Sequence, residues 1–128
     1  LGDVYKRQVL YNSGGSSTGS SNLTFDGTNL TCGGTVTANS DERLKKNIKT
    51  INNAIDIVSK LRGVEFDYIE TDQHSIGFIA QEVQNVLPEL VFGDDPKSVA
   101  YQNVVALLVE AIKELNSEIV DLKSKINN

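Results

Sequence analysis

The chain has 128 residues, a formal net charge of −5, one cysteine and one histidine. An acidic balance argues against a surface that binds nucleic-acid phosphates, and the single Cys32 excludes an intrachain disulfide or a four-cysteine metal site. The sequence contains no run of about 18 apolar residues, which is the length that would argue for a membrane span. We therefore expect one small domain with appendages, and no metal, cofactor, nucleic acid or membrane as a partner.

The first eight residues are treated separately. The sequence DVYKRQ at 3–8 resembles the translation of a transposon-end adapter that is used in sequencing libraries. We therefore expect residues 1–8 to be an assembly artefact and leave them out of the fold prediction. On this interpretation the natural protein begins far upstream, and the sequence is a C-terminal fragment of it.

Residues 9–39 are rich in small polar side chains, because 21 of the 31 are Gly, Ser, Thr or Asn. Three short stretches nevertheless alternate apolar and polar residues, with glycine-containing turns between them. We predict that these stretches, at 23–25, 29–32 and 35–37, form short strands. Their apolar content is too small for a core of their own. We therefore interpret residues 9–39 as the end of a β-rich fibre stem, which more of the chain or identical chains would cover.

Residues 41–128 have a different composition, in which helix and strand signals alternate. Helical spacing of apolar residues predicts a first helix, which Gly63 ends as a C-cap. Alternation with period two predicts strands, and Pro88 stops a second, short helix. The predicted elements are, in order, a helix at 51–61, strands at 64–68 and 76–80, a helix at 81–87 and a strand at 99–101.

The clearest periodic pattern begins at Val105. Apolar residues recur every seven positions in two series that are offset by three, which is the a/d pattern of a coiled coil. The first series is Val105, Ile112, Ile119 and Ile126, and the second is Leu108, Leu115 and Leu122. The pattern predicts a long helix whose seam faces another helix. β-Branched residues at a with Leu at d favour dimers in isolated zippers, so the heptads alone leave dimer and trimer open.

Three segments of the sequence form a recognisable set of motifs when they are taken together. They read SDERLKKNI at 40–48, IGFIAQEV followed by LPE at 76–89, and Y followed by LLVEAIKEL at 101–115. In this order and spacing they closely resemble the intramolecular chaperone of endosialidase, an auto-processing serine peptidase domain at the C-termini of phage tailspikes and tail fibres. The resemblance covers about residues 37–125.

The resemblance implies a homotrimer that brings three fibre chains into register, promotes folding of the upstream β-structure and then cuts itself off. The expected fold class is α+β. Short β-strands lead into a small α/β chaperone and autoprocessing domain at 40–100, which ends in a long C-terminal coiled-coil helix at 101–128. The implied partners are identical chains and the upstream stem. The implied location is the virion tail fibre or tailspike, made in the host cytoplasm, with the chaperone fragment released after cleavage.

On the family's S-D-x-R-x-K motif, Ser40 carries over as the catalytic nucleophile and Lys45 as its base. A serine hydroxyl needs such a base, and a lysine serves only when burial or a nearby cation lowers its pKa from about 10.4 toward 7 to 8. Residues five apart lie about 140° apart around an α-helix and on opposite faces of a strand. We therefore expect Ser40 to precede a helix with the chain bent back, or the pair to form between subunits.

The bond that is cut stays open between two positions. Attack of Ser40 on the carbonyl of Asn39 passes through a five-membered ring and gives an ester. A cut between Ser40 and Asp41, which the resemblance implies, needs attack from another copy or an activated water, because attack of Ser40 on its own carbonyl would close a strained four-membered ring.

Simpler structural roles compete with the catalytic ones. Ser40 before two acidic residues is also an ordinary helix N-cap. His74 is either a surface turn residue or an auxiliary acid or base. Gln81 and Glu82 could orient the site, cap the short helix or bridge subunits. Gly77 is expected to serve backbone geometry or close packing.

Two other functions compete with the self-cleaving chaperone. One is a permanent trimerising fibre tip without peptidase activity. The other is the same domain in a membrane-anchored transcription regulator, which would need a membrane span and a DNA-binding region beside it. Neither appears in these residues, and the Gly-rich segment favours the fibre.

Overall fold

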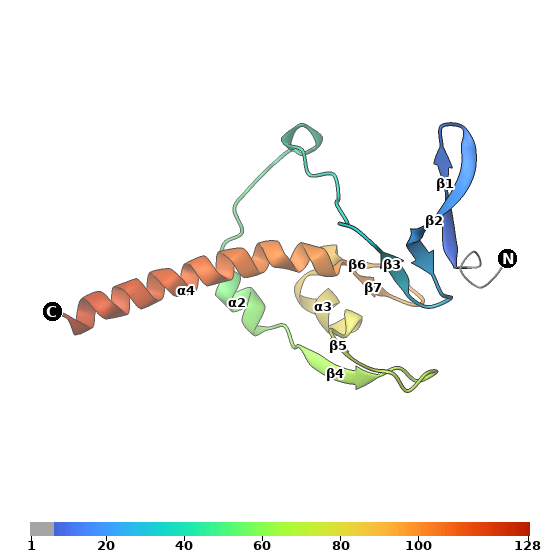
Figure 1. Cartoon of the computed structure of the whole chain (residues 1–128). Helices are drawn as coiled ribbons and strands as arrows, with labels where there is room; N and C mark the ends of the chain where they lie inside the picture. Colours follow the sequence, from blue (N-terminus) through green and yellow to red (C-terminus); the bar gives the residue numbers. More distant parts are fainter. Residues whose placement is uncertain (1–6) are drawn as a thin grey trace. The chain divides into compact units, whose positions relative to one another are not determined.

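The computed structural model describes residues 7–128 and divides the chain into two compact units, Leu1–Ile48 and Lys49–Asn128 (Figure 1). Each unit is described by itself. Of the residues set aside as an adapter artefact, 1–6 lie outside the described part. Within that part, no helix is long and apolar enough to cross a membrane. The domain border at 39/40 stays a prediction.

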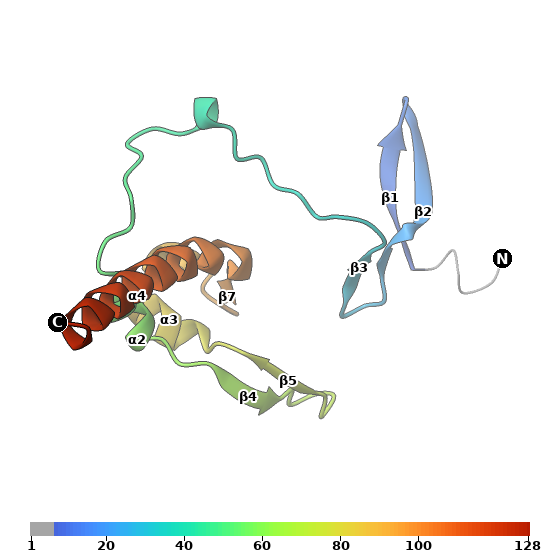
Figure 2. The ribbon, with the colours of Figure 1, turned by 60° about the vertical axis from the view of Figure 1, so that its left-hand side comes forward.

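The first unit is a three-stranded antiparallel sheet in the order β1-β2-β3 (Figure 2). Its strands are β1 (Gln8–Ser13), β2 (Ser16–Phe25) and β3 (Leu30–Cys32). A turn at Gly14 and Gly15, with φ of 60° and 97°, joins β1 to β2, and such positive φ values favour glycine. None of the described residues of this unit is buried, in line with the expectation that these strands form no core of their own.

The strand predictions for this unit are partly correct. The stretch at 23–25 falls in β2 and the stretch at 29–32 in β3, except for Asn29, and the two strands pair from Leu23 with Cys32 to Phe25 with Leu30. The stretch at 35–37 is not a strand, so that prediction is wrong. Strand β1 and the polar first half of β2 are not predicted, because the apolar residues of β1 are consecutive and do not alternate, and the first half of β2 consists of Ser, Thr and Gly.

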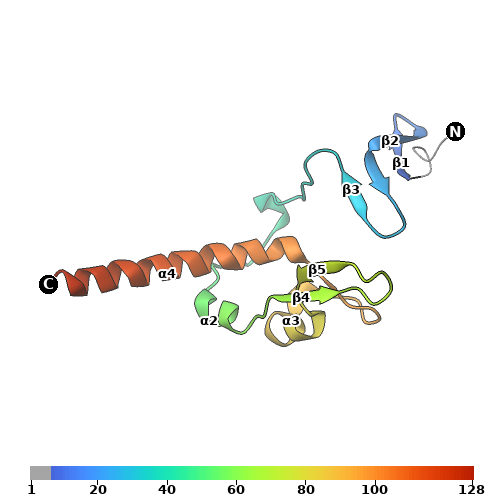
Figure 3. The same ribbon diagram turned by 60° about the horizontal axis from the view of Figure 1, so that its bottom comes forward.

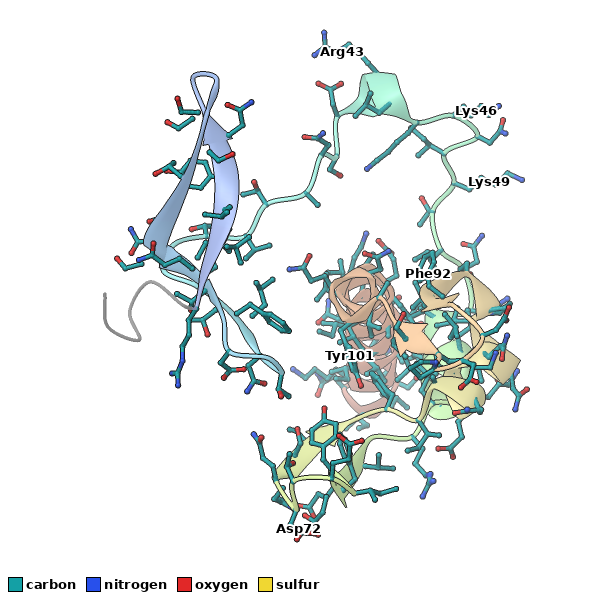
Figure 4. All side chains as sticks on the ribbon, turned by 90° about the vertical axis from the view of Figure 1, so that its right-hand side faces the viewer. Arg43, Lys46, Lys49, Asp72, Phe92 and Tyr101 are labelled. Carbon is teal, nitrogen blue, oxygen red and sulfur yellow. The ribbon has the colours of Figure 1, made fainter. Side chains whose placement is uncertain are left out.

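The second unit is α+β, as expected. Its elements are α2 (Ala54–Ser59), β4 (Val64–Asp67), β5 (His74–Gly77), α3 (Ala80–Val86), β6 (Val91–Phe92), β7 (Ser98–Val99) and α4 (Val104–Ile126). Strands β4 and β5 form one antiparallel hairpin, and β6 and β7 form another. Asp72, with φ of 56°, lies at the tip of the first hairpin (Figure 4). Short 3₁₀ turns, Pro88–Leu90 and Tyr101–Asn103, precede β6 and α4.

The predicted elements of this unit exist, and their ends shift. The helix predicted at 51–61 is shorter, since α2 covers only Ala54–Ser59. The strand predicted at 76–80 is correct only at 76–77, since β5 begins at His74, which pairs with Asp67, and ends at Gly77, and Ala80 already begins α3. The last predicted strand ends at Val99, where Ala100 and the turn that follows lead into α4. The long helix agrees with the heptad pattern to within one residue.

The core of the second unit lies where α4 covers α2 and α3. One cluster joins Ala54 of α2 to Leu107 and Ala111 of α4, and α2 runs beside α4 in Figures 1 and 3. A second cluster joins Val83 of α3 to Leu90 and Val104. These six are the only buried apolar residues among those described. Such a core is small for a unit of this length.

A side chain from α4 holds the start of α2. The carboxylate oxygens of Glu114 accept hydrogen bonds from the backbone nitrogens of Ala54 and Ile55, at 2.9 and 2.8 Å. The first backbone N–H groups of a helix have no partner within the helix, and Asn53 supplies no side-chain cap. The hydrogen bonds to Ile55 and then to Ala54 lower the pKa of Glu114 below its ordinary value.

Candidate active site

The side chains of Ser40 and Lys45 contact each other within one chain. Lys45 Nζ lies 2.6 Å from Ser40 Oγ. Both residues are exposed and lie in a segment whose one regular element is the 3₁₀ turn η1 (Glu42–Leu44). The bent-back arrangement expected for this spacing is therefore the one observed. The role of the pair as nucleophile and base stays a prediction.

The turn between the two residues explains how a separation of five positions is closed. The Leu44 nitrogen donates to the Asp41 carbonyl and the Lys45 nitrogen to the Glu42 carbonyl, both at 3.0 Å. Lys45 then leaves the turn in an extended conformation, with φ −125° and ψ 152°. Asp41 before the turn is extended as well, with φ −61° and ψ 137°, so Ser40 and Lys45 lie on extended backbone on either side of one short turn and escape the offset of about 140° of a continuous helix. The longer helix that could have followed Ser40 does not form.

Asp41, and not Ser40, is the N-cap of this turn. Asp41 Oδ1 accepts a hydrogen bond from the Arg43 nitrogen at 2.8 Å. The guanidinium of Arg43 binds the same carboxylate at 3.0 and 2.8 Å. The alternative role of Ser40 as an ordinary cap is therefore wrong for this structure, and the Ser40 hydroxyl instead contacts Lys45. Arg43 and Lys46 project outward from the segment (Figure 4).

The auxiliary candidates lie in the second unit. His74 is the first residue of β5, and its Nδ1 lies 2.9 Å from Asp67 Oδ1 on the paired strand, while its Nε2 is 3.9 Å from Glu65 Oε1. It is therefore a strand residue in a cross-strand polar cluster rather than a turn residue. Any part for His74 in the chemistry stays a prediction.

Gln81 and Glu82 lie in the first turn of α3. Glu82 binds Arg62 through both carboxylate oxygens, at 2.9 and 3.1 Å, and Gln81 is exposed. Neither caps the helix, because the N-cap is Ile79, which makes no side-chain cap. In the described part of the chain, no three His, Cys, Asp or Glu side chains gather in a way that could hold a metal ion.

Gly77 packs closely, as predicted. A Cβ on this residue would lie 2.6 Å from the Tyr101 hydroxyl. That hydroxyl accepts a hydrogen bond from the Phe78 nitrogen at 3.0 Å, and the Tyr101 ring stacks on Phe78 with centroids 5.8 Å apart. The sequence does not reveal Tyr101 as the partner, because the two residues are 24 positions apart.

The coiled-coil seam of α4 forms a continuous exposed stripe. We call the residues of the two heptad series the α4 seam. Their exposed fractions are 62% for Val105, 41% for Leu108, 64% for Ile112, 46% for Leu115, 49% for Ile119, 57% for Leu122 and 80% for Ile126. Val104, Leu107 and Ala111, each one position before a seam residue, are buried against the unit. At about 100° per residue the buried stripe therefore lies next to the seam, so one part of a wide apolar face is covered within the chain and the adjacent part is exposed.

Part of the chain matches a known family. Residues 40–92 match the model of the peptidase S74 family, which is described as chaperone of endosialidase. The matched range contains Ser40, Lys45, His74, Gln81 and Glu82.

Phage tail fibre proteins are similar to a larger part of the chain. The long tail fibre protein Gp37 of Enterobacteria phage K3 is 44% identical over 98 residues, which cover 68% of this chain and 8% of the relative. Gp37 of Enterobacteria phage T2 is 44% identical over 98 residues, with shares of 68% and 7%. Gp37 of Salmonella phage S16 is 36% identical over 100 residues, with shares of 68% and 13%. The chain thus spans a small fraction of the length of these relatives.

Proposed function

Residues 40–92 belong to the chaperone-of-endosialidase family, and from this we propose that the chain is the intramolecular chaperone of a phage tail fibre. It gathers three copies of the fibre chain, assists the folding of their β-structured stem and releases itself by autoproteolysis at Ser40. Lys45 serves as the base in a single turnover. The likeness to the Gp37 proteins supports the tail-fibre setting.

The observation that carries the peptidase proposal is the 2.6 Å contact between Lys45 Nζ and Ser40 Oγ. The atom of a general base that accepts the proton must lie within about 2.6–3.2 Å of the heavy atom that carries it. In the reaction, a neutral amine on Lys45 accepts the proton of the Ser40 hydroxyl, and Oγ forms a bond to a peptide carbonyl carbon. In the structure Lys45 Nζ donates to Ser40 Oγ. In the reaction the direction is reversed, because the Ser40 hydroxyl donates its proton to the neutral amine.

Two routes balance chemically and differ in the new N-terminus. Attack of Ser40 Oγ on the Asn39 carbonyl breaks the Asn39–Ser40 amide and gives an ester, which water hydrolyses to leave Ser40 as the first residue of the released piece. Attack on the Ser40 carbonyl, by another copy or by an activated water, breaks the Ser40–Asp41 amide and leaves Asp41 first. The family resemblance favours the second route.

The α4 seam supports the association of copies. Seven large apolar side chains of α4 are exposed in their own unit, and a strict heptad repeat is typical of a seam that another helix covers. The small core of a single copy adds a reason, because burial of the seam would supply apolar contact that one chain lacks. The number three follows from the family, since the a and d residues by themselves suit dimers.

The test compares the wild-type chain, extended by its upstream stem, with Ser40→Ala on a denaturing gel after folding. We expect the wild type to give two pieces and Ser40→Ala to stay whole. Ser117→Ala, an exposed serine outside the α4 seam, is the matched control and should cut like the wild type. Uncut wild-type protein that matches Ser40→Ala would favour the permanent trimerising tip without peptidase activity.

A further inference from the structure

One carboxylate organises the turn that brings Lys45 to Ser40. Asp41 Oδ1 accepts hydrogen bonds from the backbone nitrogen of Arg43 at 2.8 Å and from its Nε at 3.0 Å, and Oδ2 accepts from Nη2 at 2.8 Å. Asp41 thus holds the backbone and the side chain of the same residue. We call these three hydrogen bonds the Asp41–Arg43 clip.

The clip lies between the two residues whose contact the proposed reaction needs. It fixes the first residues of η1, whose two backbone hydrogen bonds at 3.0 Å set the direction in which Lys45 leaves. The segment around it is exposed, and no core packing in the first unit holds it. The local hydrogen bonds are therefore the main restraint on the distance between Ser40 and Lys45 within one chain.

We propose that Asp41 and Arg43 are positioning residues for the self-cleavage at Ser40: their clip holds the turn that places the Lys45 amine on the Ser40 hydroxyl. This inference rests on the proposed function for its link to the reaction. Neither side chain needs to touch the reacting atoms, although the backbone nitrogen of Asp41 is the leaving group when the Ser40–Asp41 bond is cut. A displacement of about 1 Å can cost a reaction about 10²-fold, so a local restraint of this kind has a measurable effect on the rate.

The clip also keeps the Asp41 carboxylate from binding the Lys45 amine. Asp41 is four positions before Lys45, and a free carboxylate there would compete with Ser40 for the amine. Arg43 occupies both oxygens instead, in a bidentate geometry that is stronger than a single hydrogen bond. The side-chain and backbone hydrogen bonds from Arg43 lower the pKa of Asp41. Glu42 and Lys46 are the other charged residues of the turn.

The first arm of the test compares two uncharged substitutions at one position. Asp41→Asn and Asp41→Ala remove the same charge, but asparagine caps a helical turn about as well as aspartate and alanine does not. We expect Asp41→Ala to cleave about fivefold more slowly than Asp41→Asn, because alanine cannot accept the hydrogen bond that caps the turn. Equal cleavage rates for the two variants would overturn the proposal.

The second arm tests the guanidinium. Arg43→Lys keeps the charge and cannot span both carboxylate oxygens. We expect it to slow cleavage by about two- to fivefold, with the fold and the oligomer unchanged. Lys60→Gln, which removes an exposed lysine paired with Asp56 at 3.0 Å in the second unit, is the control and should cleave at the wild-type rate. An Arg43→Lys rate equal to that of the control contradicts the role of Arg43.

A third arm measures the contact without relying on cleavage. Ser40→Cys is made in a Cys32→Ser background, and the alkylation of the thiol by iodoacetamide is followed against pH. A thiol beside an ammonium group ionises at lower pH, so alkylation should begin at lower pH with Asn at position 41 than with Ala. Adding Lys45→Gln should remove this difference.

The two kinds of readout separate the possible failures. If no variant cleaves and the alkylation profiles still differ as expected, the clip is supported and the proposed function is contradicted. If the wild type cleaves and the alkylation profiles of Asp41→Asn and Asp41→Ala coincide, the proposed function stands and the clip is overturned. Circular dichroism of each variant checks that the second unit, which holds the buried residues, is folded.

Discussion

At the scale of single residues, the contact between Ser40 and Lys45 has the most direct consequence. Lys45 is exposed and its amine has one hydrogen-bonded protein partner, Ser40 Oγ. Lys45→Ala should therefore leave the fold and the oligomer intact and slow processing by roughly 10²–10⁴-fold, the usual contribution of a general base. Pulse-chase gels of the extended chain measure the rate, with Lys46→Ala as the neighbouring control. Processing at the wild-type rate would remove Lys45 from the dyad.

Gly77 gives a second prediction at this scale. A methyl group at this position would lie 2.6 Å from the Tyr101 hydroxyl and 3.4 Å from its ring carbon Cζ, so the tyrosine must move and its hydrogen bonds with Phe78 would be lost. We expect Gly77→Ala to lower the free energy of unfolding by about 1–3 kcal/mol, as is typical of overpacking. Urea unfolding measures it.

A second variant, Tyr101→Phe, shows whether the contact with Tyr101 is the cause of the loss of stability. Tyr101→Phe removes the hydroxyl that the new methyl group would meet. If the contact is the cause, Gly77→Ala should cost less in the Tyr101→Phe background than in the wild type. An equal cost in both backgrounds would mean that the backbone of Gly77, and not the contact with Tyr101, makes glycine necessary.

Sequence reasoning at this scale found the residue types and missed their local partners. The spacing of Ser40 and Lys45 correctly required a bent chain. It could not show that Asp41 would cap the turn, because serine and aspartate are equally good caps and the choice depends on which side chain has another partner. Here the Ser40 hydroxyl contacts Lys45 and the Asp41 carboxylate contacts Arg43.

At the scale of elements, α2 depends on α4 for more than apolar cover. The helix has six residues, too few to be stable alone, and Glu114 supplies both acceptors for its first nitrogens. Glu114→Gln removes the charge and one of the two acceptors. We expect a lower melting temperature at pH 7. Glu118→Gln, four positions further along the same helix, is the matched control and should have little effect.

The same pair has a definite pH dependence. Because folding lowers the pKa of Glu114 from its ordinary value of 4.5, the stabilisation is fully present above that pH. It is lost as the pH falls through the lower, folded-state pKa. The difference in melting temperature between the wild type and Glu114→Gln should therefore shrink below about pH 4.5. A difference that stays constant down to pH 2 would show that the charge of Glu114 is not the cause.

Periodicity predicted the elements that have an apolar face. It failed for strands that form through backbone pairing between mostly polar residues. The heptads predicted α4, and alternation predicted β4, because both patterns mark a segment whose apolar residues share one face. Strand β1 and the first half of β2 pair through a register from Leu10 with Gly19 to Ser13 with Ser16, in which few side chains are apolar. The cap from Glu114 to α2 spans 60 positions and leaves no local signature.

At the scale of the whole molecule, the exposed α4 seam is the surface that our proposal covers with other copies of the chain. Leu115 lies in the middle of the seam with 46% of its surface exposed, so Leu115→Asp leaves the core of one chain untouched and buries a charge only in an assembly. We expect this variant to be monomeric by sedimentation velocity. Ser117→Asp, on the outer side of the same helical turn, should keep the wild-type oligomer.

Cleavage should fail together with the oligomer. Ser40 and Lys45 are exposed in one chain, and a lysine becomes an effective base when it is taken out of water. Neighbouring copies are the source of burial that the proposal provides. A Leu115→Asp monomer that cuts itself at the wild-type rate would show that the site is complete within one chain and that assembly does not control release.

Mass spectrometry of the folded, stem-extended chain tests the central claim most directly. One sample is weighed under native conditions and again after denaturation, and the small piece is sequenced from its N-terminus. The account predicts a native mass of three chains, and after denaturation a small piece that begins at Asp41, or at Ser40 if attack falls on Asn39. A native mass of one chain that stays whole after denaturation would contradict it.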